Sequence, residues 1–192
     1  MKFVAFFRNL NLGRKNCPDR TQFETAFREA GAQSAKSFLT NGTMVFEART
    51  QRGAHTVLAG ACEALGESCG LEEPAFLRTI PALADLVALD PFVSIAPGSV
   101  YECCVTFLHA PGNALSELPA QSSRGDVRIV RCTHTEVLSV SLKIGKSPGS
   151  PNAFLEKSLK QPASTRSWNT VLRLVRAPAQ GQLTGAGKNS PG

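Results

Sequence analysis

The chain lacks any long uncharged apolar segment. Its longest stretch without Lys, Arg, Asp or Glu covers residues 103–116, and Pro111 and Gly112 interrupt it. A membrane-spanning helix needs about 20 apolar residues, so we expect no membrane partner. The apolar start, residues 2–7, is short, and no small-residue cleavage site follows it. We therefore expect no secretory signal and a cytoplasmic location.

The six cysteines lack the spacing of a disulfide framework, and without a secretory signal we expect reduced, buried thiols. Cys103 and Cys104 are neighbours in an expected strand, so their side chains point to opposite faces and do not chelate together. Cys132 and His134 supply two ligands where zinc takes four. The sequence predicts no metal site and gives no sign of a cofactor.

Catalytic and nucleic-acid motifs are scarce as well. No recognisable motif includes the histidines, which lie in or beside expected loops or element ends: His55, His109 and His134. An RNA-recognition fold needs aromatic side chains on its middle strands. Phe38 and Phe46 supply them, but residues 40–43 do not resemble the RNP signature. Nucleic acid is thus not the partner we favour, and the sequence leaves open whether the protein is an enzyme.

The chain does have an unevenly distributed charge. The net charge of +6 comes from 21 Lys and Arg residues against 15 Asp and Glu residues. Residues 1–50 carry +4, residues 51–100 carry −4, residues 101–150 carry +1, and residues 151–192 carry +5. If the two basic ends meet in space, they attract an anion such as a phosphate. An ordinary solvated surface explains the same excess.

Hydrophobic patterning predicts an α+β fold whose first 80 residues form a ferredoxin-like, split βαβ unit. The predicted order is strand, helix, strand, strand, helix, strand, which gives an antiparallel sheet with both helices on one face. The predicted strands are residues 2–7, 36–40, 43–47 and 75–79, and the helices cover residues 21–30 and 57–69.

Local signals mark the ends of these elements. Thr21 and Glu24 have the spacing of a capping box, and Gly31 and Gly70 follow the two helices as C-terminal caps. Asn41-Gly42 lies between two apolar runs and predicts a two-residue hairpin turn.

Residues 81–176 predict a second α+β half, which packs against the first. Pro81 begins a helix that ends at Asp90-Pro91. Strands are expected at residues 100–108, 127–132 and 135–144. In the first of these, Tyr101 and Phe107 are expected on one face, and in the last, Leu138 and Ile144 are expected on one face. A loop at 145–151, a short helix at 153–160 and a last helix follow. Residues 177–192 have little to bury and are expected to be a disordered tail.

Two segments resemble motifs of a known family. Residues 8–16, R-N-L-N-L-G-R-K-N, resemble R-G-I-N-V-G-G-K-N. Residues 156–157, E-K, and 165–171, T-R-S-W-N-T-V, resemble E-K … T-R-N-W-N-T-V. Both motifs belong to the bacterial domain of unknown function 1697 family. Residues 37–46 are similar to its hairpin, T-Y-x-x-S-G-N-V-x-F, and Asp90-Pro91-Phe92 to its N-P-F. The resemblance spans residues 1–176 and implies a bacterial α+β protein with a ferredoxin-like portion and no known activity.

The chain departs from the family at two glycines of the first motif, where it has Asn9 and Arg14. The hairpin S-G-N of the family is here Asn41-Gly42-Thr43. Glycine permits a positive φ or a close approach of the backbone to a ligand, and these substitutions reduce that freedom.

The loop after the first strand is the strongest candidate for a site. It precedes a helix whose N-terminus favours an anion, although the loop has no Gly-Lys-Ser/Thr of a P-loop. Its candidate ligand-binding residues are Arg8, Asn11, Gly13, Arg14, Lys15 and Asn16. The functional interpretation is a cradle for phosphate or carboxylate. The alternative is a solvated basic turn whose Asn side chains bond to their own backbone.

The last helix supplies two further candidates, Arg166 and Asn169. Its apolar spacing predicts a face that packs on the core, made of Trp168, Val171, Leu172 and Val175. The opposite face is expected to carry Arg166, Asn169, Thr170 and Arg173. In the first turn the charge of Arg166 opposes the helix dipole, so it needs a compensating carboxylate of the protein, which we favour, or a bound anion.

These features favour non-catalytic binding of a phosphate- or carboxylate-bearing ligand at the loop, with Arg166 and Asn169 nearby. An enzyme acting on a phosphorylated small molecule would use the same basic groups. A structural module that dimerises through its strand edges is a third hypothesis, so both a monomer and a homodimer stay open. A single site requires Arg8 and Arg166 to lie within about 15 Å, because charges farther apart are screened.

Overall fold

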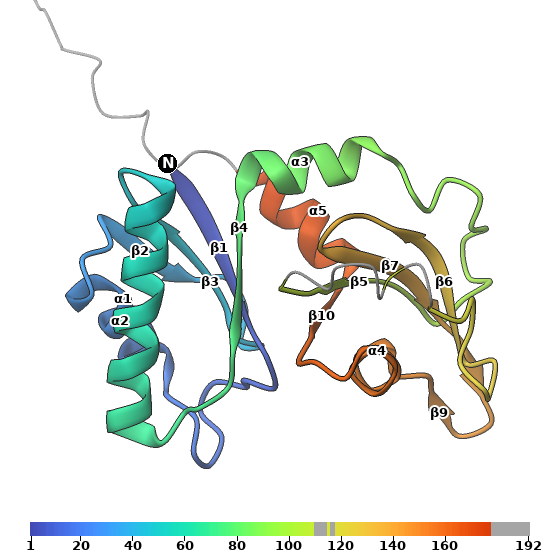
Figure 1. Cartoon of the computed structure of the whole chain (residues 1–192), viewed down its shortest axis with the longest axis horizontal. Coiled ribbons are helices and arrows are strands. Elements are labelled where there is room, and N and C mark those ends of the chain that lie inside the picture. Colours follow the sequence, from blue (N-terminus) through green and yellow to red (C-terminus); the bar gives the residue numbers. More distant parts are fainter. Residues whose placement is uncertain (110–114, 116–117, 178–192) are drawn as a thin grey trace, which may run out of the picture.

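In the computed structural model of the protein, two four-stranded antiparallel sheets form the framework (Figure 1). The structure describes residues 1–109, 115 and 118–177. Helices combined with antiparallel sheets confirm the predicted α+β class. Residues 178–192 of the expected tail lie outside the described residues. No helix in the described part of the chain is long and apolar enough to cross a membrane.

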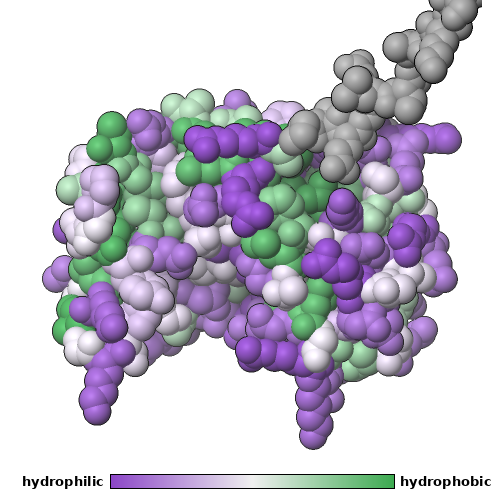
Figure 2. Space-filling view, turned by 180° about the vertical axis from the view of Figure 1, so that it is seen from behind, coloured by the Kyte–Doolittle hydropathy of each residue, from purple (hydrophilic) through white to green (hydrophobic). Residues whose placement is uncertain are grey.

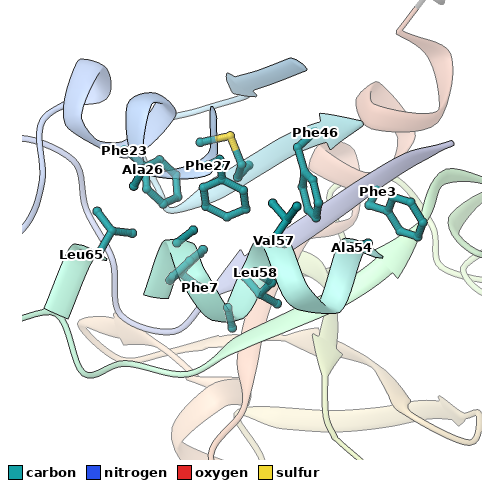
Figure 3. Packing of buried hydrophobic residues seen from close by; sticks show 14 of the residues in the cluster. Phe3, Phe7, Phe23, Ala26, Phe27, Phe46, Ala54, Val57, Leu58 and Leu65 are labelled. Atoms are coloured by element: carbon teal, nitrogen blue, oxygen red, sulfur yellow. The ribbon is translucent and has the colours of Figure 1, made fainter. Parts of the chain in front are cut away.

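The first sheet has the strand order β2-β3-β1-β4, with every neighbouring pair antiparallel. Its strands are β1 (Lys2–Phe7), β2 (Ser34–Ser37), β3 (Thr43–Glu47) and β4 (Ala75–Thr79). Helices α1 (Arg20–Glu29) and α2 (Gln51–Cys69) pack against one another on the same face of this sheet (Figures 1 and 3). The order is compatible with the predicted split βαβ arrangement.

Strand β1 is buried on both faces because its side chains alternate between two cores. Phe3, Ala5 and Phe7 point toward α1 and α2, where they join a cluster of phenylalanines (Figure 3). Val4 and Phe6 point the other way, toward the second sheet. The apolar run at the start of the chain is therefore the strand that both halves of the molecule pack against.

The second sheet has the order β10-β5-β7-β6, again antiparallel throughout. Its strands are β5 (Glu102–Phe107), β6 (Val127–Cys132), β7 (Glu136–Ser141) and β10 (Ser164–Ser167). Two short strands, β8 (Lys143–Ile144) and β9 (Ser147–Pro148), form a separate hairpin. Helices α3 (Ile80–Ala88) and α5 (Trp168–Arg176) contribute to the core between the sheets, and α4 (Pro151–Leu159) packs on the opposite face of the second sheet.

The two sheets share a continuous core between them. At its centre the rings of Phe6 and Phe107 are stacked, with centroids 4.0 Å apart and an angle of 7° between their planes. Leu83 of α3 and Val171 and Leu174 of α5 complete this cluster. Burial of β1 thus depends on the second half of the chain as well as on the first.

The first helix begins at a different cap from the predicted one. The side chain of Asp19 accepts from the Gln22 N–H at 2.8 Å, and the Gln22 side chain accepts from the Asp19 N–H at 2.9 Å. The predicted capping box of Thr21 and Glu24 is wrong, since Thr21 is already inside the helix and Glu24 accepts from the Ser37 N–H at 2.9 Å. The C-terminal caps are confirmed, because Gly31 and Gly70 both have a positive φ.

The hairpin between β2 and β3 has no two-residue turn. Strand β2 ends at Ser37, and the Phe38 N–H donates to the Thr43 carbonyl at 2.9 Å across a four-residue loop. Asn41 and Gly42 lie in this loop, where the Gly42 carbonyl accepts from the Phe7 N–H at 2.9 Å. The predicted turn is wrong because the carbonyls of this loop bond to other elements of the fold.

The last helix starts later than predicted, at Trp168 with Ser167 as its N-cap. Arg166 therefore belongs to β10 and not to the first helical turn. Val171 is buried as predicted, but Leu174 and Thr170 are buried too, whereas Trp168, Leu172 and Val175 are only half-buried. Thr170, which was expected on the opposite face, therefore does not lie on the solvent side.

The strand predicted at residues 135–144 is also shorter than expected. It ends at Ser141, because the Leu142 N–H bonds to the Asp126 carbonyl at 2.8 Å and the chain leaves the sheet for the β8–β9 hairpin. Ile144 is consequently 47% exposed and does not share the core face of Leu138. Tyr101, which precedes β5, is 60% exposed, so it too lies outside the predicted core face.

The six cysteines are all free thiols, as predicted. Cys104 is buried and the other five are half-buried, so burial is less complete than expected. Burial raises the pKa of Cys62 to about 11 and raises the pKa of Cys104 further. Cys62 and Cys104 therefore stay protonated at neutral pH.

We expect Phe6→Ala to lower the free energy of unfolding by about 3–5 kcal/mol, because the change removes the stacked ring and leaves a cavity between the sheets. Urea unfolding followed by circular dichroism measures the loss. The control is Ile144→Ala, at an exposed position, which should change stability by no more than about 0.5 kcal/mol. A loss below about 1 kcal/mol for Phe6→Ala would show that the sheets do not depend on this contact.

Candidate functional site

A polar hollow of about 370 Å³ lies between the loop after β1, the β2–β3 loop and the N-terminal end of α4. It is near the border of the two sheets, and the surface of the molecule is indented between two lobes in the view of Figure 2. The residues that line the hollow are Asn9, Leu10, Asn11, Asn41, Ser150, Asn152, Ala153, Glu156, Ser164, Thr165 and Arg166.

Arg166 forms the buried wall of the hollow. Its residue is 7% exposed, and β10 holds it opposite Val105 of β5. The guanidinium extends from the second sheet to the first, where Nη2 donates to the Phe7 carbonyl at 2.7 Å. Its acceptors are the carbonyls of Phe7, Asn41, Gly42 and Thr165 and the hydroxyls of Thr43 and Ser164, at 2.7 to 3.3 Å.

The charge of Arg166 is therefore held by neutral oxygen atoms. Among the described residues, no carboxylate is a partner of this side chain. The expectation of an internal carboxylate partner is thus wrong. Burial lowers the pKa of Arg166 to about 10, and the group stays a cation at neutral pH.

Arg8 has the opposite arrangement, because two carboxylates compensate its charge. Its Nε lies 2.5 Å and its Nη2 3.0 Å from the two carboxylate oxygens of Glu156, in a bidentate pair. Its Nη1 lies 2.7 Å from Oε2 of Glu73. The hydrogen bond to Glu156 raises the pKa of Arg8, and the same bond lowers the pKa of Glu156. Arg8 is thus a link between the two halves of the chain, with little charge left for a ligand.

The two motif segments meet in space. Arg166 donates to the carbonyl of Phe7, which directly precedes Arg8. Glu156 of the E-K segment lines the hollow and binds Arg8. Arg8 and Arg166 therefore lie within the distance that a single site requires. The contacts that bring them together were not predicted from the sequence.

The remaining predicted site residues are spread over a wider surface. Asn11 is exposed and lines the hollow beside Arg166, whereas Asn16 lines a neighbouring hollow of about 520 Å³ with Arg8, Glu73 and Cys17. The tip of the loop is exposed and consists of Gly13, Arg14 and Lys15. Asn169 is exposed on α5 and belongs to the lining of neither hollow as the structure describes them.

Several backbone N–H groups of the loop are already bonded within the protein. The N–H groups of Leu12, Gly13, Arg14 and Cys17 all donate to backbone carbonyls within the protein, at 2.8 to 3.3 Å. Asn9 has φ +49° at a position where the family motif has glycine. Asparagine tolerates this left-handed conformation better than most residues, so the positive φ is retained without glycine. These four N–H groups are therefore not available to an anion.

Helix α4 directs its N-terminal end at the hollow. Ser150 is its N-cap, Pro151 is its first residue, and the Asn152 side chain accepts from Thr165 Oγ1 at 3.1 Å. The Thr165 hydroxyl also bonds to Thr106 of β5 at 2.7 Å. The positive end of the helix dipole and the Arg166 guanidinium therefore lie around the same space.

A second interaction between the sheets was not anticipated from the sequence. Arg78 of β4 lies 2.5 Å from Oε1 of Glu136 in β7 and also donates to the carbonyls of Leu108 and Thr135. Burial alone would raise the pKa of Glu136, but the hydrogen bond from Thr133 and the charge of Arg78 hold it below its ordinary value. Arg78 stands in a strand without a motif, so no sequence signal identified it.

One segment with the spacing of a catalytic serine motif was not identified from the sequence. Residues 145–149, G-K-S-P-G, match the G-x-S-x-G pattern of a nucleophile elbow. Such an elbow places a strained serine between a strand and a helix, but Ser147 has no positive φ and lies exposed in the β8–β9 hairpin. Gly149 has a packing role, because a Cβ there would lie 2.1 Å from the Asp126 carbonyl oxygen. The structure does not support a nucleophile at Ser147.

We expect Arg166→Met to lower the free energy of unfolding by about 3–5 kcal/mol, because the carbonyls of Phe7, Asn41 and Gly42 would each lose the hydrogen bond from the guanidinium. Chemical denaturation at neutral pH measures this loss. Arg176→Met, at an exposed position of α5, is the matched control and should stay within about 0.5 kcal/mol of the natural protein. Equal losses in the two variants would contradict the role assigned to Arg166.

The ion pair of Glu156 predicts a pH dependence of stability. Because its folded pKa is lowered, its contribution is present above the ordinary glutamate pKa and is lost as the pH falls toward the folded pKa. Glu156→Gln should cost about 1–3 kcal/mol at pH 7, and this difference should shrink as the pH falls from about 6 to about 3. Urea unfolding at several pH values measures it. The matched control is Glu67→Gln, on the exposed face of α2, which should change the free energy of unfolding by no more than about 0.5 kcal/mol at pH 7. A difference for Glu156→Gln that stays constant with pH would refute the assignment.

A solved structure with the same overall fold comes from a conserved bacterial protein, SP0830 of Streptococcus pneumoniae. The two share a TM-score of 0.60 at 12% sequence identity, and the match covers 91% of this chain and 96% of the other. At this identity the likeness concerns the fold alone. No curated protein sequence matches the chain.

A family model described as "Protein of unknown function (DUF1697)" matches residues 1–136. The match includes the loop after β1 and the β2–β3 hairpin, and it ends before the motif segments at residues 156–157 and 165–171. The family resemblance expected from the loop and the hairpin is thereby confirmed. The chain belongs to the DUF1697 family of proteins of unknown function.

Proposed function

We propose that the protein binds an anionic ligand, bearing a phosphate or a carboxylate, in the hollow between the β1–α1 loop and the N-terminal end of α4. The observation that carries the proposal is the buried guanidinium of Arg166, which lines the hollow without a carboxylate partner among the described residues. A cation in this place raises the affinity of the hollow for anions, because the low dielectric constant around a buried charge screens its attraction to an anion less than water does.

Three further features support the binding of a small anion. The hollow has a volume of about 370 Å³, within the range of small-molecule sites. The α4 N-terminus adds the positive end of a helix dipole. Asn11 and Asn41 bring amide groups, which donate to anionic oxygens. Among the described residues of this lining, the acidic one is Glu156, and Arg8 neutralises it.

The site favours binding over catalysis. The titratable residues in its lining are Glu156 and Arg166. Glu156 has a lowered pKa, which makes it a weak base, and Arg166 stays a cation at neutral pH. A general acid or base works best with a pKa near the operating pH, and the described lining has no such group.

Pairing through strand edges receives no support from the contacts of β2 and β6. At β2, Glu24 accepts from the Ser37 N–H, so part of this edge is occupied by a side chain of α1. At β6, the Ile129 N–H donates to the Ala120 carbonyl at 2.8 Å, and the preceding segment lies along the edge. Part of each of these two edges is therefore occupied by other segments of the chain.

The experiment is a thermal-shift screen of the full chain with inorganic phosphate, sugar phosphates, nucleotides and dicarboxylates, followed by calorimetry of the anions that raise Tm. A ligand that binds only the folded state at about 100 times its Kd stabilises the protein by about 2.7 kcal/mol. Asn11→Asp should weaken binding at least about tenfold, because it adds a negative charge at the rim of the hollow.

The matched control is Asn169→Asp, which makes the same change on α5 outside the hollow and should leave the Kd unchanged. No shift with any member of the panel would refute the proposal. Equal weakening by the two variants would show that the anion binds elsewhere.

A further inference from the structure

Besides the polar hollow, the structure has an apolar groove on the first sheet, which the proposed function does not use. The groove has a volume of about 650 Å³ and lies on the sheet face opposite α1 and α2. Over β1 and β4 this face is covered by the core between the sheets. Over β2 and β3 the described residues leave a groove, with Phe38 and Val45 half-buried in it and Ile80 and Leu174 beside them. The guanidinium of Arg173 lies 5.3 Å from the centroid of the Phe38 ring.

The rim of this groove is mainly cationic. Lys2, Arg20 and Lys36 line it together with one acidic residue, Glu47, which lies 3.9 Å from Lys2. An apolar floor with a positive rim fits a partner surface that is apolar and acidic.

The contacts of β2 favour a partner that lies on the sheet face. At the end of the β2 edge, Ser37 bonds through its N–H to Glu24 at 2.9 Å and through its carbonyl to Arg20 at 3.5 Å, so side chains of α1 occupy this part of the edge. Two strands spaced by about 4.8 Å expose a strip about 10 Å wide, which is close to the diameter of a helix. The open face thus has the width for one helix.

Helix α3 and the turn after it carry a surface of the required chemistry. Leu89 is 40% and Val93 is 78% exposed, and both are large apolar side chains at the surface. Asp85 and Asp90 are exposed beside them in sequence. We call these four residues the α3 surface. The exposed apolar side chains complement the apolar floor of the groove, and the carboxylates complement its cationic rim.

The groove and the α3 surface lie close to one another along the chain. Ile80 lines the groove and is also the first residue of α3. From there α3 runs away from the first sheet toward the second (Figure 1), so the α3 surface does not reach the groove of its own chain. In two copies related by a two-fold axis, each α3 surface can enter the groove of the other copy. Such a reciprocal contact uses the groove and the α3 surface of both copies, so the assembly stops at a dimer.

We propose that the partner of the groove is a second copy of this chain, in a two-fold dimer with reciprocal contacts between the groove and the α3 surface. Each dimer contains the contact twice, which brings the buried area closer to the roughly 800 Å² per partner that stable interfaces need. The contact combines burial of Phe38 and Val45 by Leu89 and Val93 with attraction between the rim cations and the acidic residues.

Sedimentation velocity of the full chain at low salt tests the dimer, from about 1 µM to about 500 µM, the range in which weak interfaces associate. The expected result is a rise from monomer to dimer mass with concentration, and weaker association at high salt. Lys36→Glu and Asp85→Lys should each weaken association at least about tenfold, and the double variant should recover it. Both positions are exposed, so circular dichroism should show an unchanged fold.

The matched control is Lys146→Glu, which makes the same charge change in the exposed β8–β9 hairpin. It should leave the association constant unchanged. A monomer at every concentration overturns the proposal, as does a dimer that neither Lys36→Glu nor Asp85→Lys weakens. Species that grow beyond a dimer also overturn it, because they require head-to-tail contacts. Anion binding is measured separately and does not depend on this result.

Discussion

The guanidinium of Arg166 must find acceptors for its N–H groups in a place that excludes water. It finds them on both sides of the border between the sheets, in the carbonyls of Phe7 and Asn41 and the hydroxyls of Thr43 and Ser164. A buried cation without these bonds is very unfavourable, so the end of β1, the β2–β3 loop and β10 have to keep their relative positions. The hollow next to Arg166 is a consequence of that arrangement.

Two other arginines connect the halves differently, through carboxylates. Arg8 pairs with Glu156 and Arg78 with Glu136, and each pair joins the first sheet or its loop to the second half of the chain. Together with the stacked rings of Phe6 and Phe107, these contacts determine how the sheets meet. Part of the positive charge of the chain is thus paired inside the fold, whereas Arg166, next to the hollow, has no carboxylate partner among the described residues.

Much of the first half could be predicted because its signals are local. The apolar run of β1, the helical spacing of Phe23 and Phe27, and the caps at Gly31 and Gly70 depend on neighbours within a few residues. The predictions failed where a distant group competed for the backbone. Asn41-Gly42 correctly predicted the hairpin of β2 and β3, but the predicted two-residue turn was wrong. The loop has four residues, and the carbonyls of Asn41 and Gly42 bind Arg166, more than 120 residues away. The prediction of Arg166 as a helical residue failed for the same reason.

The amino-acid sequence by itself determined the α+β class, the order of most elements and the family, since periodicity, caps and short motifs are local properties of the chain. It also identified the Arg8 loop and Arg166 as candidates. Only the tertiary structure decided which arginine is neutralised, because Glu73 and Glu156 come to Arg8 from 65 and 148 residues away. Side-chain types show that a charge is present, but the partners of that charge are determined by which strands and helices pack together.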